Sequence, residues 1–247
     1  MIWDKKKIEN HIKAARLLEA IKNKAFKLIK NNNNISEYEV HKFILDQFKK
    51  NNLKTDRANC IVAFKQNTSF VHYYPSQYCR RLILDSLIMI DLWARLKEKN
   101  APYADITWMA YYGRKIPNEI IKVFNIVKLA RDKTIKYIIN DLIKGNIPTG
   151  KEVDKIARIY INDKGYGDFF LHTTGHSLGI EGAHGKEAGI GLKNQKQLIK
   201  NLGYTIEPGI YLKNKFGVRS EIDFYINNNN KLVLTSNIQK NITLIKV

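Results

Sequence analysis

Five ionisable side chains stand inside short apolar segments of this 247-residue chain. Each has β-branched or aromatic neighbours, in "IMIDLWA", "PYADITW", "TTGHSLG", "YTIEPGIY" and "GVRSEIDF". A buried carboxylate is either protonated or paired, because an uncompensated charge in apolar surroundings is costly. Four carboxylates and one imidazole in such surroundings therefore call for a shared counter-charge. The five residues are Asp91, Asp105, His176, Glu207 and Glu221.

Two divalent cations would supply that counter-charge, since their four positive charges balance four carboxylates. Hard carboxylate oxygens with one imidazole suit manganese, iron(II), cobalt and zinc. The five residues include no cysteine, which argues against a structural zinc site. Acidic residues in strands also commonly face solvent, so residue types alone leave that alternative open.

Four helices are predicted from hydrophobic periodicity and from helix boundary signals. The first covers residues 5–30, where apolar residues recur at helical spacing. The third lies between Pro117 and Gly145, because proline favours the first turn and glycine ends a helix. The second and fourth begin at capping boxes, in which serine or threonine is followed three residues later by glutamate. These pairs are Ser36 with Glu39 and Thr149 with Glu152.

Segments rich in β-branched and aromatic residues predict strands after each helix pair. In the first half they are "CIVAF", "SFVHYY", "RLILDSLIMIDLWARL" and "ADITWMAYY". In the second half they are "FFLHTTGH", "TIEPGIYL", "RSEIDFYI", "KLVLTS" and "ITLIKV". The repeated order predicts an α+β fold of two similar halves around one sheet-built centre, in a single domain over residues 1–247. The glycine-rich stretch 172–203 is the expected functional loop.

The chain resembles the pita-bread metallopeptidase family, which includes methionine aminopeptidases, Xaa-Pro aminopeptidases and prolidases. The resemblance rests on "FVHYYP", "IDLW" with "ADIT", "TTGHSLG", "IEPGIYL" and "GVRSEID", in this order over residues 72–223. The terminal segments are also similar, so the resemblance covers essentially the whole chain. It implies the pita-bread (creatinase/aminopeptidase) fold, with two pseudo-symmetric α+β halves around a curved antiparallel sheet.

The resemblance also implies a centre of two metal ions, with manganese favoured over cobalt, iron and zinc. Asp91 would chelate one ion, Asp105 and Glu221 would bridge both, and His176 and Glu207 would bind the second. A water or hydroxide bridging the ions would attack the scissile peptide carbonyl near neutral pH. Glu207, or a partner nearby, would carry the proton to the leaving amine.

Two further histidines match family positions that contact the substrate or the oxyanion without binding metal. His72 lies in "FVHYYP". His184 lies eight residues after His176, where the family usually has seven, and Gly185 follows it where the family usually has glutamate. The loop therefore either accommodates an extra residue or displaces His184.

Other departures from the family pattern concern the surroundings of the ligands. Asp91 and Asp105 are 14 residues apart, where the common family spacing is 11, and the extra residues fall in a hairpin-like turn. Trp108 stands where many relatives have arginine, which puts the contacts around the ligands in question. His11 and His41 are interpreted as structural, while His172 borders the site without an assigned role.

The "GVR" element before the last glutamate resembles the Xaa-Pro aminopeptidase and prolidase branch, and methionine aminopeptidases usually lack it. Arg219 lies two residues before Glu221, so on a strand both would share one face, and the guanidinium is expected to contact a metal-site carboxylate. This branch implies peptide substrates with proline second. A methionine aminopeptidase acting on nascent chains and a non-catalytic binding homologue are the alternatives.

Composition sets further expectations about partners. The net charge of +19 would suit nucleic acid, but the lysines are scattered and accompanied by asparagine runs, which favours compositional bias. The chain has no apolar run near the roughly 20 residues of a membrane span and no secretory signal, so a cytoplasmic protein without a membrane partner is expected. It begins almost at the first catalytic-domain helix, so we expect no N-terminal creatinase-like domain, and homodimer formation stays open.

Overall fold

The four predicted helices are present in the computed structural model, which describes residues 2–56 and 59–246. Both capping boxes form, and Gly145 ends the third helix with a φ of 85°, which glycine adopts without strain. None of the helices in the described residues is long and apolar enough to cross a membrane. The helices are α1 (Lys5–Lys30), α2 (Glu37–Lys50), α3 (Asn118–Ile143) and α4 (Gly150–Asp163).

The strands of the described residues form three hydrogen-bonded sheets. The largest is built on the long hairpin β3–β4, with β1 and β2 antiparallel to β3 and β10 parallel to β4. Two smaller antiparallel sheets have the orders β5-β8-β9 and β6-β7. The strands are β1 (Leu53–Lys54), β2 (Cys60–Phe64), β3 (Ser86–Leu96), β4 (Ala104–Tyr112), β5 (Gly203–Ile206), β6 (Gly209–Leu212), β7 (Phe216–Arg219), β8 (Ile222–Ile226), β9 (Leu232–Leu234) and β10 (Thr243–Ile245).

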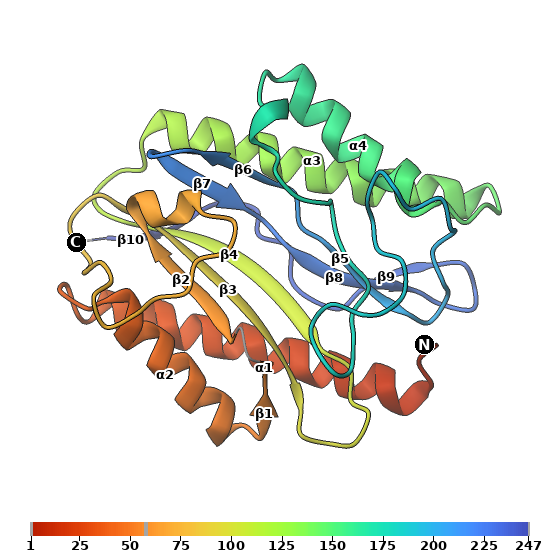
Figure 1. Cartoon of the computed structure of the whole chain (residues 1–247), viewed down its shortest axis with the longest axis horizontal. Helices are drawn as coiled ribbons and strands as arrows, with labels where there is room; N and C mark the ends of the chain where they lie inside the picture. Colours follow the sequence, from red (N-terminus) through yellow and green to blue (C-terminus); the bar gives the residue numbers. More distant parts are fainter. Residues whose placement is uncertain (1, 57–58, 247) are drawn as a thin grey trace.

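The strands lie between two pairs of helices, with α1 and α2 on one side and α3 and α4 on the other (Figure 1). Side chains alternate between the faces of β3, because successive residues of a strand point in opposite directions. Ile88 and Ile90 pack into the core formed with α1 and α2, whereas Met89 packs into a second core that includes α3. The hairpin β3–β4 is therefore covered on both faces.

Two of the predicted strands in the first half do not form as expected. Residues 69–74 are not a strand, because the chain turns out of the sheet at Lys65, which has a φ of 52°, into a short 3-10 helix (Lys65–Ser69). The strand predicted from residue 81 begins only at Ser86, since Asp85 has a φ of 60° that strand geometry excludes.

In the second half, several predicted strand residues lie between strands. Glu207 separates β5 from β6, because Pro208 has no N–H to donate to a sheet. Glu221 likewise lies between β7 and β8, so it does not share a strand with Arg219. Residues 169–176 form no strand beyond an isolated bridge between Gly175 and Ile190. These segments carry three of the predicted ligand residues, Glu207, Glu221 and His176.

Candidate metal centre and its surroundings

The hairpin β3–β4 places two aspartates on the same face of the sheet. Asp91 pairs with Thr107, and Asp105 pairs with Trp93, so the two carboxylates are diagonal neighbours across the strands. The longer connection between β3 and β4 lies outside this paired region, which explains how a spacing of 14 residues is accommodated.

Trp108 belongs to the opposite face of β4. Its ring lies under the Lys22 ammonium, which is 3.2 Å from the ring centre, and it packs against the core formed with α1. The tryptophan that replaces the usual arginine therefore points away from Asp105 and Thr107. It does not disturb the contacts of the ligands.

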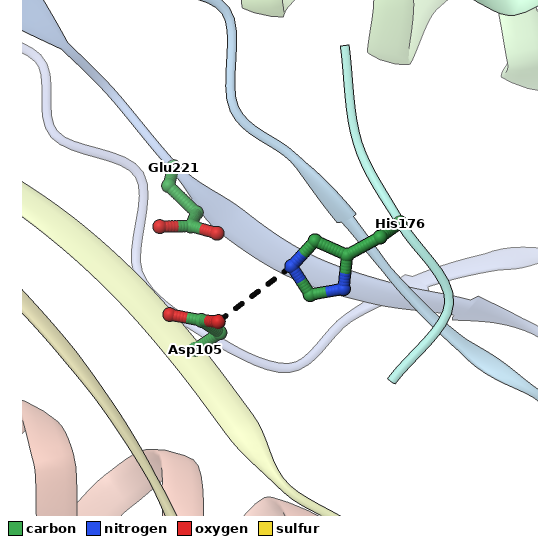
Figure 2. A group of neighbouring side chains, drawn as sticks. All are labelled: Asp105, His176 and Glu221. Carbon is green, nitrogen blue, oxygen red and sulfur yellow. Dashed lines mark ion pairs between the residues drawn. The ribbon is translucent and has the colours of Figure 1, made fainter. Parts of the chain in front are cut away.

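The structure brings all five predicted ligand residues to one cavity. Asp105, His176 and Glu221 each offer one ligand atom, and these atoms lie within 4.8 Å of one another (Figure 2). His176 Nε2 is 3.7 Å from Asp105 Oδ2 and 3.4 Å from Glu207 Oε1. Asp91 lines the same cavity together with these four residues.

The imidazole of His176 is oriented for coordination through Nε2. Its Nδ1 lies 3.0 Å from the carbonyl oxygen of Ser177, which can only accept, so Nδ1–H donates and Nε2 keeps its lone pair. Burial lowers the pKa of His176 to about 4. The ring is therefore neutral at physiological pH, as a metal ligand must be.

The carboxylates of the cavity repel one another in a buried environment. Burial, followed by the charge of Glu221, raises the pKa of Asp105 well above its usual value, and burial raises the pKa of Glu207 to about 7. One oxygen of Asp91 and one of Asp105 lack a hydrogen-bond partner among the described residues. Buried carboxylates with unpartnered oxygens and mutual repulsion fit divalent cations, which would satisfy both.

Arg219 contacts the cluster from the end of β7. Its guanidinium donates to Asp91 Oδ2, to Thr107 Oγ1 at 3.0 Å and to the Tyr211 hydroxyl at 3.1 Å. Thr107 in turn donates to Glu221 at 2.7 Å. Arg219 thus fixes the orientation of one carboxylate directly and contacts the partner of another.

Tyr211, which sequence reasoning did not single out, extends this network to His172. The Tyr211 hydroxyl is 2.8 Å from His172 Nε2, and His172 Nδ1 is 2.8 Å from the Thr173 carbonyl, so Nδ1–H donates and Nε2 accepts from the tyrosine. Burial, then the charge of Arg219, lowers the pKa of His172 to about 3. The only signal for Tyr211 in the sequence was its place in "IEPGIYL".

Another missed residue is Asp223, whose side chain is fully buried. Its Oδ2 accepts the backbone N–H of Asp105 at 2.9 Å. His11 lies nearby and is held between the Tyr103 carbonyl and the Thr235 hydroxyl, both at 2.7 Å from its ring nitrogens. Asp223 follows Glu221 by two residues, and its acidic type in a buried strand was the available signal.

The longer loop brings His184 to the cavity that the predicted ligands line. A bridge pairs Leu178 with His184, and Gly179 N–H donates to the Ala183 carbonyl at 2.9 Å, so the extra residue is contained in a tight turn. The rings of His176 and His184 stack, with their centres 3.8 Å apart and their planes inclined by 14°. The sequence left two possibilities open, an extra residue held within the loop or a displaced His184. In the structure the loop holds the extra residue and His184 stays at the cavity.

His72 also lines this cavity, from an exposed segment between β2 and β3. The fully buried carboxylate of Glu37 in α2 anchors this segment by accepting Phe64 N–H at 2.6 Å, the Tyr73 hydroxyl at 2.6 Å and Arg80 N–H at 3.0 Å. Glu37 was not predicted, since a glutamate in the first turn of a helix is common on electrostatic grounds alone.

Comparison with known proteins relates the chain to one family of peptidases. A family model described as Metallopeptidase family M24 matches residues 9–228. An uncharacterized peptidase of Staphylococcus haemolyticus is 30% identical over 234 residues, which are 95% of this chain and 62% of that protein. One of Methanocaldococcus jannaschii is 33% identical over 232 residues, covering 92% and 60% of the two proteins.

Solved structures show the same fold. An X-Pro aminopeptidase from Thermotoga maritima superposes with a TM-score of 0.86 and 27% identity, over 99% of this chain and 64% of that one. A prolidase from Pyrococcus furiosus gives 0.82 and 25%, over 97% and 66%. This chain spans less than two thirds of the two curated relatives and of both solved structures. The predicted pita-bread α+β fold is confirmed.

Proposed function

Because this chain belongs to metallopeptidase family M24, we propose that it is an aminopeptidase dependent on two divalent metal ions, which releases an N-terminal residue that precedes proline. One observation carries the proposal: three buried carboxylates, the partly buried carboxylate of Glu207 and a neutral imidazole line one cavity together with two further histidines. The similarity to an X-Pro aminopeptidase and a prolidase supports the preference for proline.

The family resemblance implies the ligand assignment, and the shared cavity of the five side chains supports it. Asp91, Asp105, His176, Glu207 and Glu221 would hold the two ions, with manganese as the favoured metal. When bound, two such ions lower the pKa of a shared water and polarise the scissile carbonyl.

The residues around the ligands perform the remaining steps. Glu207, whose Oε1 lies 3.4 Å from Nε2 of His176, would accept a proton from the attacking water and give it to the leaving amine. His184 and His72 line the cavity from opposite loops and would donate hydrogen bonds to the substrate carbonyl as negative charge develops on its oxygen. Arg219 orients the carboxylate of Asp91 by donating a hydrogen bond to it.

A peptide panel tests this proposal. Protein freed of metal and reconstituted with Mn²⁺, Co²⁺, Zn²⁺ or Fe²⁺ is incubated with matched peptides that differ only in having proline or alanine at the second position. We expect release of the first residue from the proline series in at least one metal. Preferential cleavage of Met-Ala peptides would instead identify a methionine aminopeptidase, and absence of both binding and turnover with every metal would leave a non-catalytic homologue.

A further inference from the structure

Asp56 lies between β1 and β2 and links two parts of the metal cavity. It is half-buried and lines the cavity, although it is not among the predicted ligands. Its Oδ1 accepts the indole N–H of Trp93 at 2.8 Å, and its Oδ2 accepts the backbone N–H of Ala183 at 3.1 Å. We propose that Asp56 is a positioning residue that holds His184 against the metal centre; this inference rests on the proposed function.

The hydrogen bond from Trp93 holds the carboxylate of Asp56 in a fixed position against β3. Trp93 belongs to β3, two residues after Asp91, so both side chains lie on the same face of the strand. The indole is nearly buried, with 7% of its surface exposed, and its backbone is paired with that of Asp105. The carboxylate of Asp56 therefore has a fixed position relative to the strands that carry two of the proposed ligands.

The hydrogen bond from Ala183 to Asp56 fixes the backbone next to His184. Ala183 immediately precedes His184 and is itself buried, with 4% of its surface exposed, so its N–H needs an acceptor. The base of the loop is tied by the bond from Gly185 N–H to the Ser177 carbonyl, at 2.7 Å. Asp56 holds the loop at Ala183, close to its tip.

The proposal explains how a loop that is one residue longer than is usual in the family keeps its histidine in place. The turn from residue 179 to 183 contains two glycines, which offer no side chain to pack. A carboxylate from a distant segment supplies the fixed contact instead. The ring of His184 can then remain stacked on His176, where it reaches the carbonyl of a bound substrate.

The test uses substitutions that change only the acceptor. In Asp56→Asn the amide oxygen can still accept from Trp93, but the amide NH₂ then faces the Ala183 N–H, so that bond is lost. We expect kcat to fall about tenfold with KM within about twofold, because small misplacements of a catalytic group slow the chemical step. Trp93→Phe, the matched control, keeps the Asp56–Ala183 bond and should lower kcat by less than about threefold.

Two combinations distinguish positioning from a general structural effect. In Asp56→Asn with Trp93→Phe, the amide is free to turn its oxygen toward Ala183, so kcat should recover most of the loss. On a His184→Ala background, Asp56→Asn should have no further effect on kcat, since the residue through which it acts is absent. A tenfold loss on both backgrounds, or no recovery in the double variant, would overturn the proposal.

A spectroscopic measurement separates this proposal from the peptidase assignment. In ¹H–¹⁵N spectra of the histidine side chains, Asp56→Asn should shift the ring signals of His184 and leave those of His72 unchanged. If no metal yields peptidase activity, the proposed function fails while the shift still tests the link between Asp56 and His184. Unchanged His184 signals in Asp56→Asn would sink the inference even in an active enzyme.

Discussion

Two loops carry the histidines that line the cavity without being proposed ligands, and they are held in different ways. The His72 loop (residues 65–85) is anchored by Glu37, which is fully buried and accepts from the N–H of Phe64, just before the loop, and from the N–H of Arg80 within it. The His184 loop (residues 178–187) is anchored by Asp56, which is half-buried and contacts one backbone N–H of the loop. In both cases a carboxylate from another segment replaces the rigidity that a strand would provide.

Because Glu37 is more deeply buried than Asp56, we expect the two carboxylates to contribute differently to stability and to activity. Donors that lose a fully buried acceptor remain unsatisfied, whereas water can enter the half-buried position of Asp56 and accept from its donors. Loss of the Glu37 carboxylate should therefore weaken the fold and the site together. Loss of the Asp56 carboxylate should act mainly on the site, with a change in unfolding free energy below about 1 kcal/mol.

The largest effect is expected for Glu37→Ala. It removes the acceptor of Phe64 N–H, the Tyr73 hydroxyl and Arg80 N–H at once. The free energy of unfolding should fall by about 3 kcal/mol, and kcat should fall about 100-fold because His72 is released. Urea unfolding and steady-state kinetics at a temperature where the variant is folded provide the measurements.

Tyr73→Phe is the control for this substitution, since it removes one donor and leaves the carboxylate in place. It should cost about 1 kcal/mol and change kcat little. A Glu37→Ala protein as stable as the wild type would show that the two anchors do not differ in the way their burial indicates.

Metal binding should raise the free energy of unfolding by about as much as Glu37→Ala lowers it. This stabilisation should not depend on the contacts that hold either loop. In the metal-free protein burial raises the pKa of Glu207 to about 7 and those of Asp105 and Glu221 well above their usual values. The folded state then binds more protons than the unfolded state, so stability falls as pH rises from about 4.5 through 7. Ions that bind the deprotonated carboxylates offset this loss most at high pH.

Thermal melting with and without Mn²⁺, at pH 6 and pH 8, measures this stabilisation. At a concentration of 100 times Kd it should reach about 2.7 kcal/mol, and it should be larger at pH 8. Asp56→Asn and Glu37→Gln should gain as much from the metal as the wild type, whereas Glu221→Gln should gain far less. A smaller gain at pH 8 than at pH 6 would contradict the proposed ligand set.

The strands and the loops also differ in what could be predicted from the sequence. Asp91 and Asp105 lie where alternation along a strand and the hairpin pairing put them, and both rules follow from local patterns. The contacts of Glu37 and Asp56 join segments far apart in the chain, and the donors to both carboxylates include backbone N–H groups, which residue types do not reveal. Sequence reasoning therefore reached the candidate ligands through the family motifs, but not the residues that hold the two loops.

Gly179→Ala should disturb the His184 loop from within. A Cβ at Gly179 would collide with the Gly182 carbonyl and would lie 2.9 Å from the His184 carbonyl, so the turn would have to open. Overpacking of this kind costs about 1–3 kcal/mol, and kcat should fall about tenfold as His184 moves. An unchanged kcat would mean that Asp56 alone determines the position of the histidine.

Gly182→Ala, at the tip of the same turn, should have the smallest effect. A Cβ there would lie 3.4 Å from Asp56 Oδ2, an ordinary van der Waals contact, and Gly182 is not among the described glycines with positive φ. Alanine also restricts the unfolded chain, so stability should stay equal or rise by about 0.4–1 kcal/mol, with kcat unchanged. Because the two glycines lie three residues apart in one turn, equal losses of kcat in both variants would show that the tip is held by its glycines and not by the carboxylate of Asp56.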